Sequence, residues 1–183
     1  LKEGTVNTLT DTGATGIDKD DGVSTTYTGG INCKKIPLTI NGKGTLNITT
    51  TNGNGIKATN SLKIIDATIS VKGAGDKAAG HNGVSGKTEV VLENANLDVY
   101  SDGDALKTTL DETDIAEDAT LADSGNIDIN GGTIKLISAN GDALSSSRTL
   151  NLNPTKLEAI TKNEARSTAD RSYKAIKAGK TIN

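Results

Sequence analysis

Short runs in which apolar and polar residues alternate recur along most of the chain. Typical pairs of apolar residues two positions apart are Leu38 and Ile40, and Leu62 and Ile64. Alternation with a period of two predicts strands with one buried face and one polar face. We therefore expect strands at residues 36–40, 45–49, 62–65, 68–71, 90–92, 97–99, 126–129, 133–137, 150–152 and 156–160.

A short phrase repeats between these runs. It occurs as Gly53-Asn54-Gly55-Ile56-Lys57, as Gly103-Asp104-Ala105-Leu106-Lys107 and as Gly141-Asp142-Ala143-Leu144. Each copy precedes a strand, a turn and a second strand, which is typical of a solenoid. The fold class predicted is an all-β, right-handed, single-stranded parallel β-helix of about five to seven coils. Residues 1–7 show no pattern, and residues 11–22 indicate an exposed loop.

The two ends of the chain add an expectation about its boundaries. Residues 173–183 resemble the start of a further coil, cut off at its first strand. The chain contains no Met and no recognisable polar cap. We expect residues 1–183 to be a single β-helix domain, truncated within the repeat region at one or both ends.

The composition fits a narrow aliphatic core better than a globular one. Hydrophobic residues make up 33% of the chain, with no Phe, Trp or Met and three Tyr. Disorder would explain this composition, but it would not preserve the alternation. The net charge of −3 gives no basic surface for nucleic acid. No apolar run approaches the ~20 residues of a membrane span.

Acidic residues at matching places suggest a metal site. Asp104 and Asp142 follow the first Gly of the repeated phrase, and Asn54 has this place in an earlier copy. We take Asp76 as the equivalent residue in the coil between Asn54 and Asp104. Coils stack about 4.8 Å apart, so these carboxylates would repel one another unless a cation lay between them. Calcium, with its preference for oxygen ligands, fits such a column. The alternative is that they are solvated turn residues. The full set of candidate metal ligands is Asp76, Asp102, Asp104, Asp142, Asp111 and Asp114.

Signals for catalysis are few. The single histidine, His81, lies in a Gly-rich stretch and has no Ser or Cys partner that the sequence identifies. Eliminative cleavage of an acidic sugar would need a Lys or Arg base near calcium, and Lys57, Lys107 and Arg148 follow the repeated phrase. Solvated basic side chains are the simpler interpretation of these three residues.

The chain resembles a bacterial family of carbohydrate-binding proteins with a polysaccharide-lyase-like right-handed parallel β-helix. The resemblance lies in residues 1–11, 38–46, 54–57 and 127–134. The family's Gly-Asp-Gly-Ile appears here as Gly-Asp-Ala-Leu twice and as Gly-Asn-Gly-Ile once. The resemblance implies a secreted or surface-attached protein that binds plant-type polysaccharides, acidic ones included, and holds calcium.

We therefore expect an extracellular, non-catalytic polysaccharide-binding protein supported by calcium. Its predicted ligand-binding residues are Asn54, Lys57, Lys107 and Tyr100. Two alternatives come from other classes of function. One is a subunit that associates head to tail into a surface filament or layer. The other is a calcium-dependent lyase acting on uronate polymers.

Overall fold

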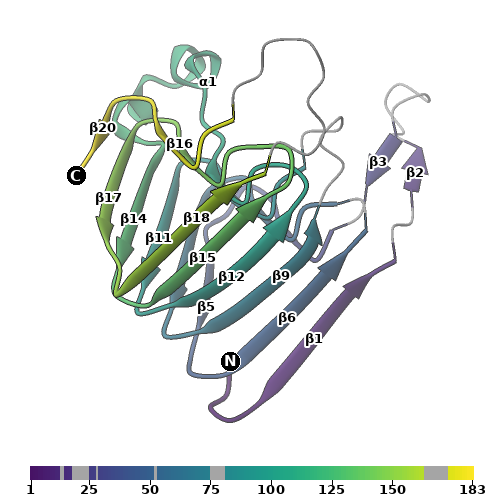
Figure 1. Cartoon of the computed structure of the whole chain (residues 1–183). Coiled ribbons are helices and arrows are strands. Elements are labelled where there is room, and N and C mark those ends of the chain that lie inside the picture. Colours follow the sequence, from purple (N-terminus) through teal and green to yellow (C-terminus); the bar gives the residue numbers. More distant parts are fainter. Residues whose placement is uncertain (13–14, 18–24, 28, 52, 75–80, 163–172) are drawn as a thin grey trace.

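The described part of the chain is built from three parallel β-sheets. The computed structural model describes residues 1–183 except 13–14, 18–24, 28, 52, 75–80 and 163–172 (Figure 1). We name the sheets after the length of their strands: the short sheet, the middle sheet with strands of intermediate length, and the long sheet. The short sheet contains β4 (Ile31–Cys33), β7 (Ile56–Ala58), β10 (Val84–Gly86), β13 (Leu106–Thr108), β16 (Leu144–Ser146) and β19 (Ile176–Ala178). The middle sheet contains β5 (Leu38–Asn41), β8 (Ser61–Ile65), β11 (Glu89–Glu93), β14 (Asn126–Asn130), β17 (Thr149–Asn153) and β20 (Thr181–Ile182). The long sheet contains β1 (Val6–Asp11), β6 (Thr45–Thr50), β9 (Thr68–Ala74), β12 (Asn96–Ser101), β15 (Thr133–Ser138) and β18 (Lys156–Thr161).

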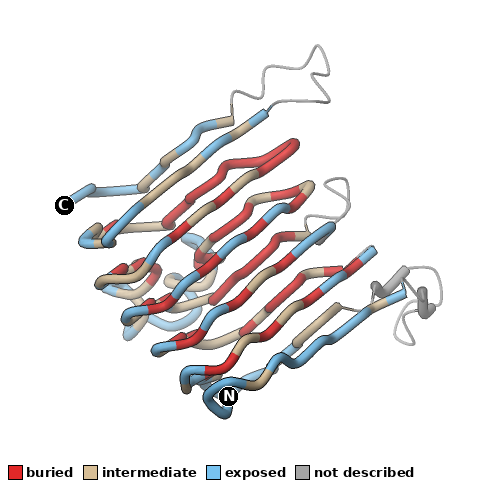
Figure 2. The backbone as a smooth tube through the Cα atoms, turned by 60° about the horizontal axis from the view of Figure 1, so that its bottom comes forward, coloured by how far each residue is buried: buried red, intermediate tan, exposed pale blue. Residues whose placement is uncertain are grey.

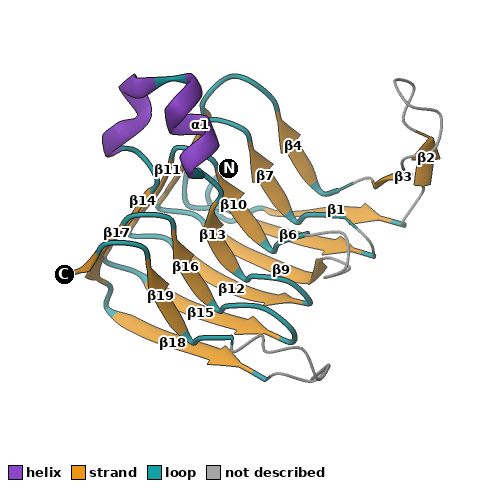
Figure 3. Ribbon diagram, turned by 90° about the horizontal axis from the view of Figure 1, so that it is seen from above, coloured by secondary structure: helices purple, strands orange, loops and turns teal. Residues whose placement is uncertain are grey.

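Successive strands enter the three sheets in turn. From β4–β5–β6 to β16–β17–β18, each set of three strands forms one coil and pairs in parallel with the next set. Strand β1 pairs before the first complete coil, and β19 and β20 pair after the last. Figure 3 shows the strands of each sheet stacked side by side. This all-β arrangement agrees with the predicted parallel β-helix and its number of coils.

The core is a stack of aliphatic side chains inside the coils. In the middle sheet, Leu62, Val90, Ile127 and Leu150 lie in register on neighbouring strands and are fully buried. Figure 2 shows buried and exposed positions alternating along the strands. Full burial of such a side chain contributes about 1.5–3 kcal/mol, so many small aliphatic contacts replace the aromatic residues that the core lacks.

Buried hydroxyl groups satisfy the backbone where the chain turns between sheets. Ser101 Oγ and Ser138 Oγ, at the ends of neighbouring long strands, both donate to the carbonyl of Gly103, each over 2.8 Å. Thr108 and Ser146 are the last residues of the short strands β13 and β16, and both donate to the carbonyl of Gly125. Such partners matter because a buried carbonyl without a hydrogen bond is costly.

Three parts of the chain differ from the sequence-based expectation. Residues 6–11 form β1, which pairs with β6 along its whole length, although the sequence analysis expected no strand there. The repeated phrase also contains a strand of its own, because residues 56–58, 106–108 and 144–146 belong to the short sheet. The last residues form two strands, β19 and β20, rather than one.

Outside the coils, the described elements are small. Strands β2 (Thr15–Ile17) and β3 (Thr25–Tyr27) pair antiparallel. The insertion between β13 and β14 contains α1 (Glu112–Glu117) and a 3₁₀ helix, η2 (Ala119–Asp123). Within the described residues, no helix has the length and apolar character needed to cross a bilayer.

Candidate functional site

A polar column runs along the turns that lead into the short sheet. Asn54, Asp104 and Asp142 occupy equivalent positions and use a side-chain oxygen in the same way. Each accepts a hydrogen bond from the backbone N–H of the equivalent residue in the next coil: Asn82 for Asn54, Asp142 for Asp104, and Lys174 for Asp142, over 2.7 to 2.8 Å. The column therefore joins neighbouring coils.

The strand register corrects one member of this column. Val84 pairs with Ile56 on one side and with Leu106 on the other, which places Asn82 at the position that the sequence analysis gave to Asp76. Asp76 itself lies outside the described residues. The error arose because the connection between β9 and β10 is longer than those between β6 and β7, β12 and β13, and β15 and β16, so matching by Gly-Asp chose the wrong pair.

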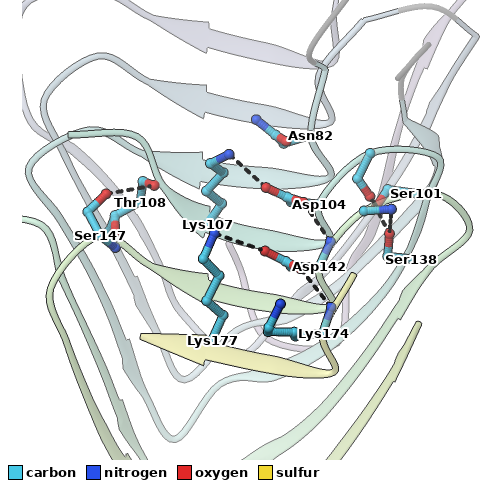
Figure 4. Close-up of polar contacts among 12 residues, drawn as sticks. Asn82, Ser101, Asp104, Lys107, Thr108, Ser138, Asp142, Ser147, Lys174 and Lys177 are labelled. Carbon is cyan, nitrogen blue, oxygen red and sulfur yellow. Dashed lines mark hydrogen bonds and ion pairs between the residues drawn. The ribbon is translucent and has the colours of Figure 1, made fainter. Parts of the chain in front are cut away.

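Lysine side chains neutralise the two carboxylates of the column. Lys107 Nζ lies 2.7 Å from Asp104 Oδ2, and Lys177 Nζ lies 3.7 Å from Asp142 Oδ2 (Figure 4). Lys57, Lys107 and Lys177 share one line of the short sheet, with Ser85 and Ser145 between them. Backbone amides and ammonium groups thus contact both oxygens of Asp104 and Asp142, and the two lysines offset the charge of the two carboxylates.

The described residues do not bring three of the predicted calcium ligands together. Asp102 accepts a hydrogen bond from Asn140 Nδ2 over 2.6 Å, and Asp111 and Asp114 lie elsewhere, on α1. Among the described residues, no three His, Cys, Asp or Glu side chains form a group that could hold a metal ion. Calcium therefore stays a prediction of the sequence, which melting temperatures with and without a chelator would test. A decrease in chelator that Asp104→Ala removes would support it.

Asp111 and Asp114 have a structural role at the start of α1. The two side chains form a capping box, in which each accepts a hydrogen bond from the backbone N–H of the other. Asp114 also forms an ion pair with Lys87. The hydrogen bond from Lys87, together with that from Asp111, lowers the pKa of Asp114 below its usual value, against a smaller opposing effect of burial.

The lowered pKa of Asp114 predicts a pH-dependent contribution to stability. This contribution is complete above the pKa of the unfolded chain, about 3.9, and is lost as the pH falls through the lower folded-state pKa. We expect Asp114→Asn to reduce the free energy of unfolding by at most about 1 kcal/mol at pH 6, since the pair lies at the surface. Urea unfolding at pH 6 and at pH 3 should show this difference shrinking in acid. A difference that grows in acid would contradict the assignment.

The three basic residues proposed for a lyase are not brought together. Lys57 and Lys107 lie on the same line of the short sheet, two strands apart. Arg148 follows β16 at the opposite end of that sheet, where its Nη2 lies 3.5 Å from Glu112 Oε1 of α1. Lys107 is paired with Asp104. This arrangement gives no support to a shared catalytic role for the three residues.

The outer face of the long sheet carries a different polar surface. Thr68, Asn96 and Thr133 lie in register on β9, β12 and β15, and Ser70, Asp98 and Lys135 lie in register beside them. These six residues line a shallow groove of about 500 Å³, together with Ile69 and Leu97, whose side chains are buried in the core. We name it the sheet groove. Asn96 Oδ1 accepts a hydrogen bond from Thr133 N over 3.0 Å, so the Asn96 side chain is held in place.

Tyr100 extends this outer face. It lies two residues beyond Asp98 on β12 and is 37% exposed. Lys162, just after β18, places its Nζ 4.9 Å from the centre of the Tyr100 ring, a cation–π distance. Of the four predicted ligand-binding residues, Tyr100 therefore lies near the sheet groove, whereas Asn54, Lys57 and Lys107 belong to the short sheet and its turns.

Sequence reasoning missed the residues of the sheet groove. The signal was present, since Thr68 and Ser70, Asn96 and Asp98, and Thr133 and Lys135 are the polar partners of alternating apolar residues. The sequence did not show that these residues align across three neighbouring strands.

The comparisons with known proteins identify the family. A family model described as "Carbohydrate-binding domain-containing protein" matches residues 1–183. The chain belongs to this family. Neither a curated protein nor a solved structure matches it.

Proposed function

We propose that this protein binds a polysaccharide on the outer face of its long sheet, in the sheet groove. The observation that carries the proposal is the groove's lining of hydroxyl, amide, carboxylate and ammonium groups, aligned over three strands of a chain that belongs to a carbohydrate-binding family. Such convergent hydrogen-bonding groups are what fixes a bound ligand in a protein site.

The spacing of the strands favours a polymer that crosses them. Neighbouring strands lie about 4.8 Å apart, close to the length of one pyranose ring in an extended chain. A polymer lying across β9, β12 and β15 would meet two polar side chains on each strand. Lys135 offers a cation for an acidic sugar, and Asp98 accepts hydrogen bonds from hydroxyl groups.

The finer parts of the proposal rest on chemistry and on resemblance. A right-handed parallel β-helix is favoured because parallel crossover connections are overwhelmingly right-handed. We propose an extracellular or cell-surface location, where plant-type polysaccharides would be met, and a non-catalytic role. An absorbance increase from unsaturated product on polygalacturonate would instead identify a lyase, and filaments seen by negative-stain microscopy would support the self-assembly alternative.

Removing the charged groups of the sheet groove should weaken binding. We expect Lys135→Ala and Asp98→Ala each to lower the affinity for the bound polysaccharide by at least about tenfold, since a charge-assisted hydrogen bond contributes about 1.5–3 kcal/mol. Affinity electrophoresis through gels containing polygalacturonate or a neutral β-glucan measures this directly. Lys34→Ala, at an exposed position between β4 and β5, loses the same charge as Lys135→Ala but away from the groove. Its retardation by the polysaccharide, taken relative to its own mobility in a gel without polysaccharide, should equal that of the wild type. Equal retardation of all the variants would contradict the proposal.

A further inference from the structure

A second groove lies where the middle sheet turns into the long sheet. Its volume is about 630 Å³, and it crosses three consecutive coils. We name it the turn groove. Each of its turns leads directly into a long strand, so it lies beside the sheet groove at the start of β12, β15 and β18. Its lining residues are Glu93, Asn94, Asn130, Gly131, Asn153, Pro154 and Thr155.

The side chains of this groove are aligned by the strand register. Glu93, Asn130 and Asn153 pair in turn as the last residues of β11, β14 and β17. The turns themselves are held by backbone hydrogen bonds, in which Asn94 N donates to the Asn130 carbonyl and Gly131 N to the Asn153 carbonyl. Among the described residues, the side-chain amides of Asn130 and Asn153 make no hydrogen bond within the protein. Their donors and acceptors therefore face outward, one pair per coil.

Gly131 opens the middle of this groove. The same turn position holds Asp66 and Asn94 in the two preceding coils, and both have positive φ angles, 55° and 49°. Gly131 has a φ of 69° and no side chain. A Cβ atom built there would lie 2.5 Å from Asn94 Oδ1. A side chain at this position would thus extend into the space between Asn94 and Pro154.

We propose that the turn groove is a second sugar subsite, selective for an uncharged sugar, an inference that rests on the proposed function. Among its described lining residues there is no Lys or Arg. The charge of Glu93 is balanced by Lys63 over 2.8 Å, and its carboxylate only accepts hydrogen bonds, so it offers no contact to the carboxylate of an acidic sugar. The two asparagine amides supply donors and acceptors for neutral hydroxyl groups, and Pro154 offers apolar surface. The sheet groove, by contrast, contains Lys135, whose positive charge would attract an acidic sugar.

The two subsites can be distinguished with two fractions of a plant cell-wall pectin hydrolysate, one neutral and one acidic. Each fraction is titrated into ¹⁵N-labelled protein while the side-chain amide signals of Asn130 and Asn153 and the backbone signal of Lys135 are followed. We expect the neutral fraction to shift the Asn130 and Asn153 signals. Gly131→Asn should abolish that response yet melt close to the wild type, because Asn occupies this turn position in a neighbouring coil. Lys135→Ala should leave the response intact.

A second variant, Asn153→Ala, removes one amide from an exposed position and should weaken the same response. If the Asn130 and Asn153 signals do not move with the neutral fraction, or if Gly131→Asn responds like the wild type, the second subsite is wrong. In that case a shift at Lys135 with either fraction leaves the proposed function standing. If Lys135 is also silent with both fractions, the proposed function fails as well.

Discussion

Gly132→Ala is expected to lower the free energy of unfolding by about 2–5 kcal/mol, the largest effect of any substitution considered for this protein. Gly132 has a φ of 75°, which a residue with a Cβ atom adopts at a cost. A Cβ atom there would also lie 1.9 Å from the carbonyl oxygen of Ala95. That oxygen belongs to the backbone of the preceding coil, so neighbouring coils would have to separate. Urea unfolding followed by circular dichroism measures the loss.

The neighbouring glycine provides the matched control. Gly131 also has a positive φ, but its Cβ atom would meet only the end of the Asn94 side chain, which can move. Gly131→Asn should therefore cost less than about 1 kcal/mol, since Asn tolerates this backbone region. If Gly132→Ala and Gly131→Asn are equally stable, the close approach of the two coils at Ala95 is not as described.

Asp104→Ala is expected to lower the free energy of unfolding by about 1–3 kcal/mol. Asp104 Oδ1 accepts the hydrogen bond from Asp142 N, and its other oxygen pairs with Lys107. Alanine leaves the buried N–H of Asp142 without its acceptor, and the cost of an unsatisfied buried donor is of this size. The same urea titration measures the change.

Asp104→Asn separates the hydrogen bond from the ion pair. Asn54 shows that an amide oxygen serves the same purpose two coils away, where it accepts from Asn82 N. The Lys107 side chain is 35% exposed, so the ion pair itself contributes little. We expect Asp104→Asn to lose well under half of what Asp104→Ala loses. An equal loss in the two variants would show that the charge, rather than the link between coils, is what stabilises this column.

The prediction of the strands was successful because alternation is a local property. Leu62 and Ile64, or Leu46 and Ile48, have to point inward once the chain is extended, whatever lies beside them. Strand β1 was missed for the same reason. In β1 the inward positions carry Asn7, Leu9 and Asp11, which show no apolar alternation, and pairing with β6 alone makes this segment a strand.

The polar column shows where local inference reached its limit. The sequence placed Asp104 and Asp142 at equivalent positions, and the structure confirms that equivalence. It could not show that Lys107 and Lys177 lie within ion-pair distance, because contacts between side chains depend on how the turns direct them. The predicted need for a cation depended on that missing information.

The amino-acid sequence by itself determined the all-β class, the repeated coils and most strand positions, since each follows from residues only a few places apart. The tertiary structure alone decided which residues share a face. Thr68, Asn96 and Thr133 lie side by side across the sheet groove, and Glu93, Asn130 and Asn153 across the turn groove, although insertions of different length separate them in the chain. Backbone hydrogen bonds between coils fix that register, and a register formed over such distances in sequence leaves no local pattern from which to predict it.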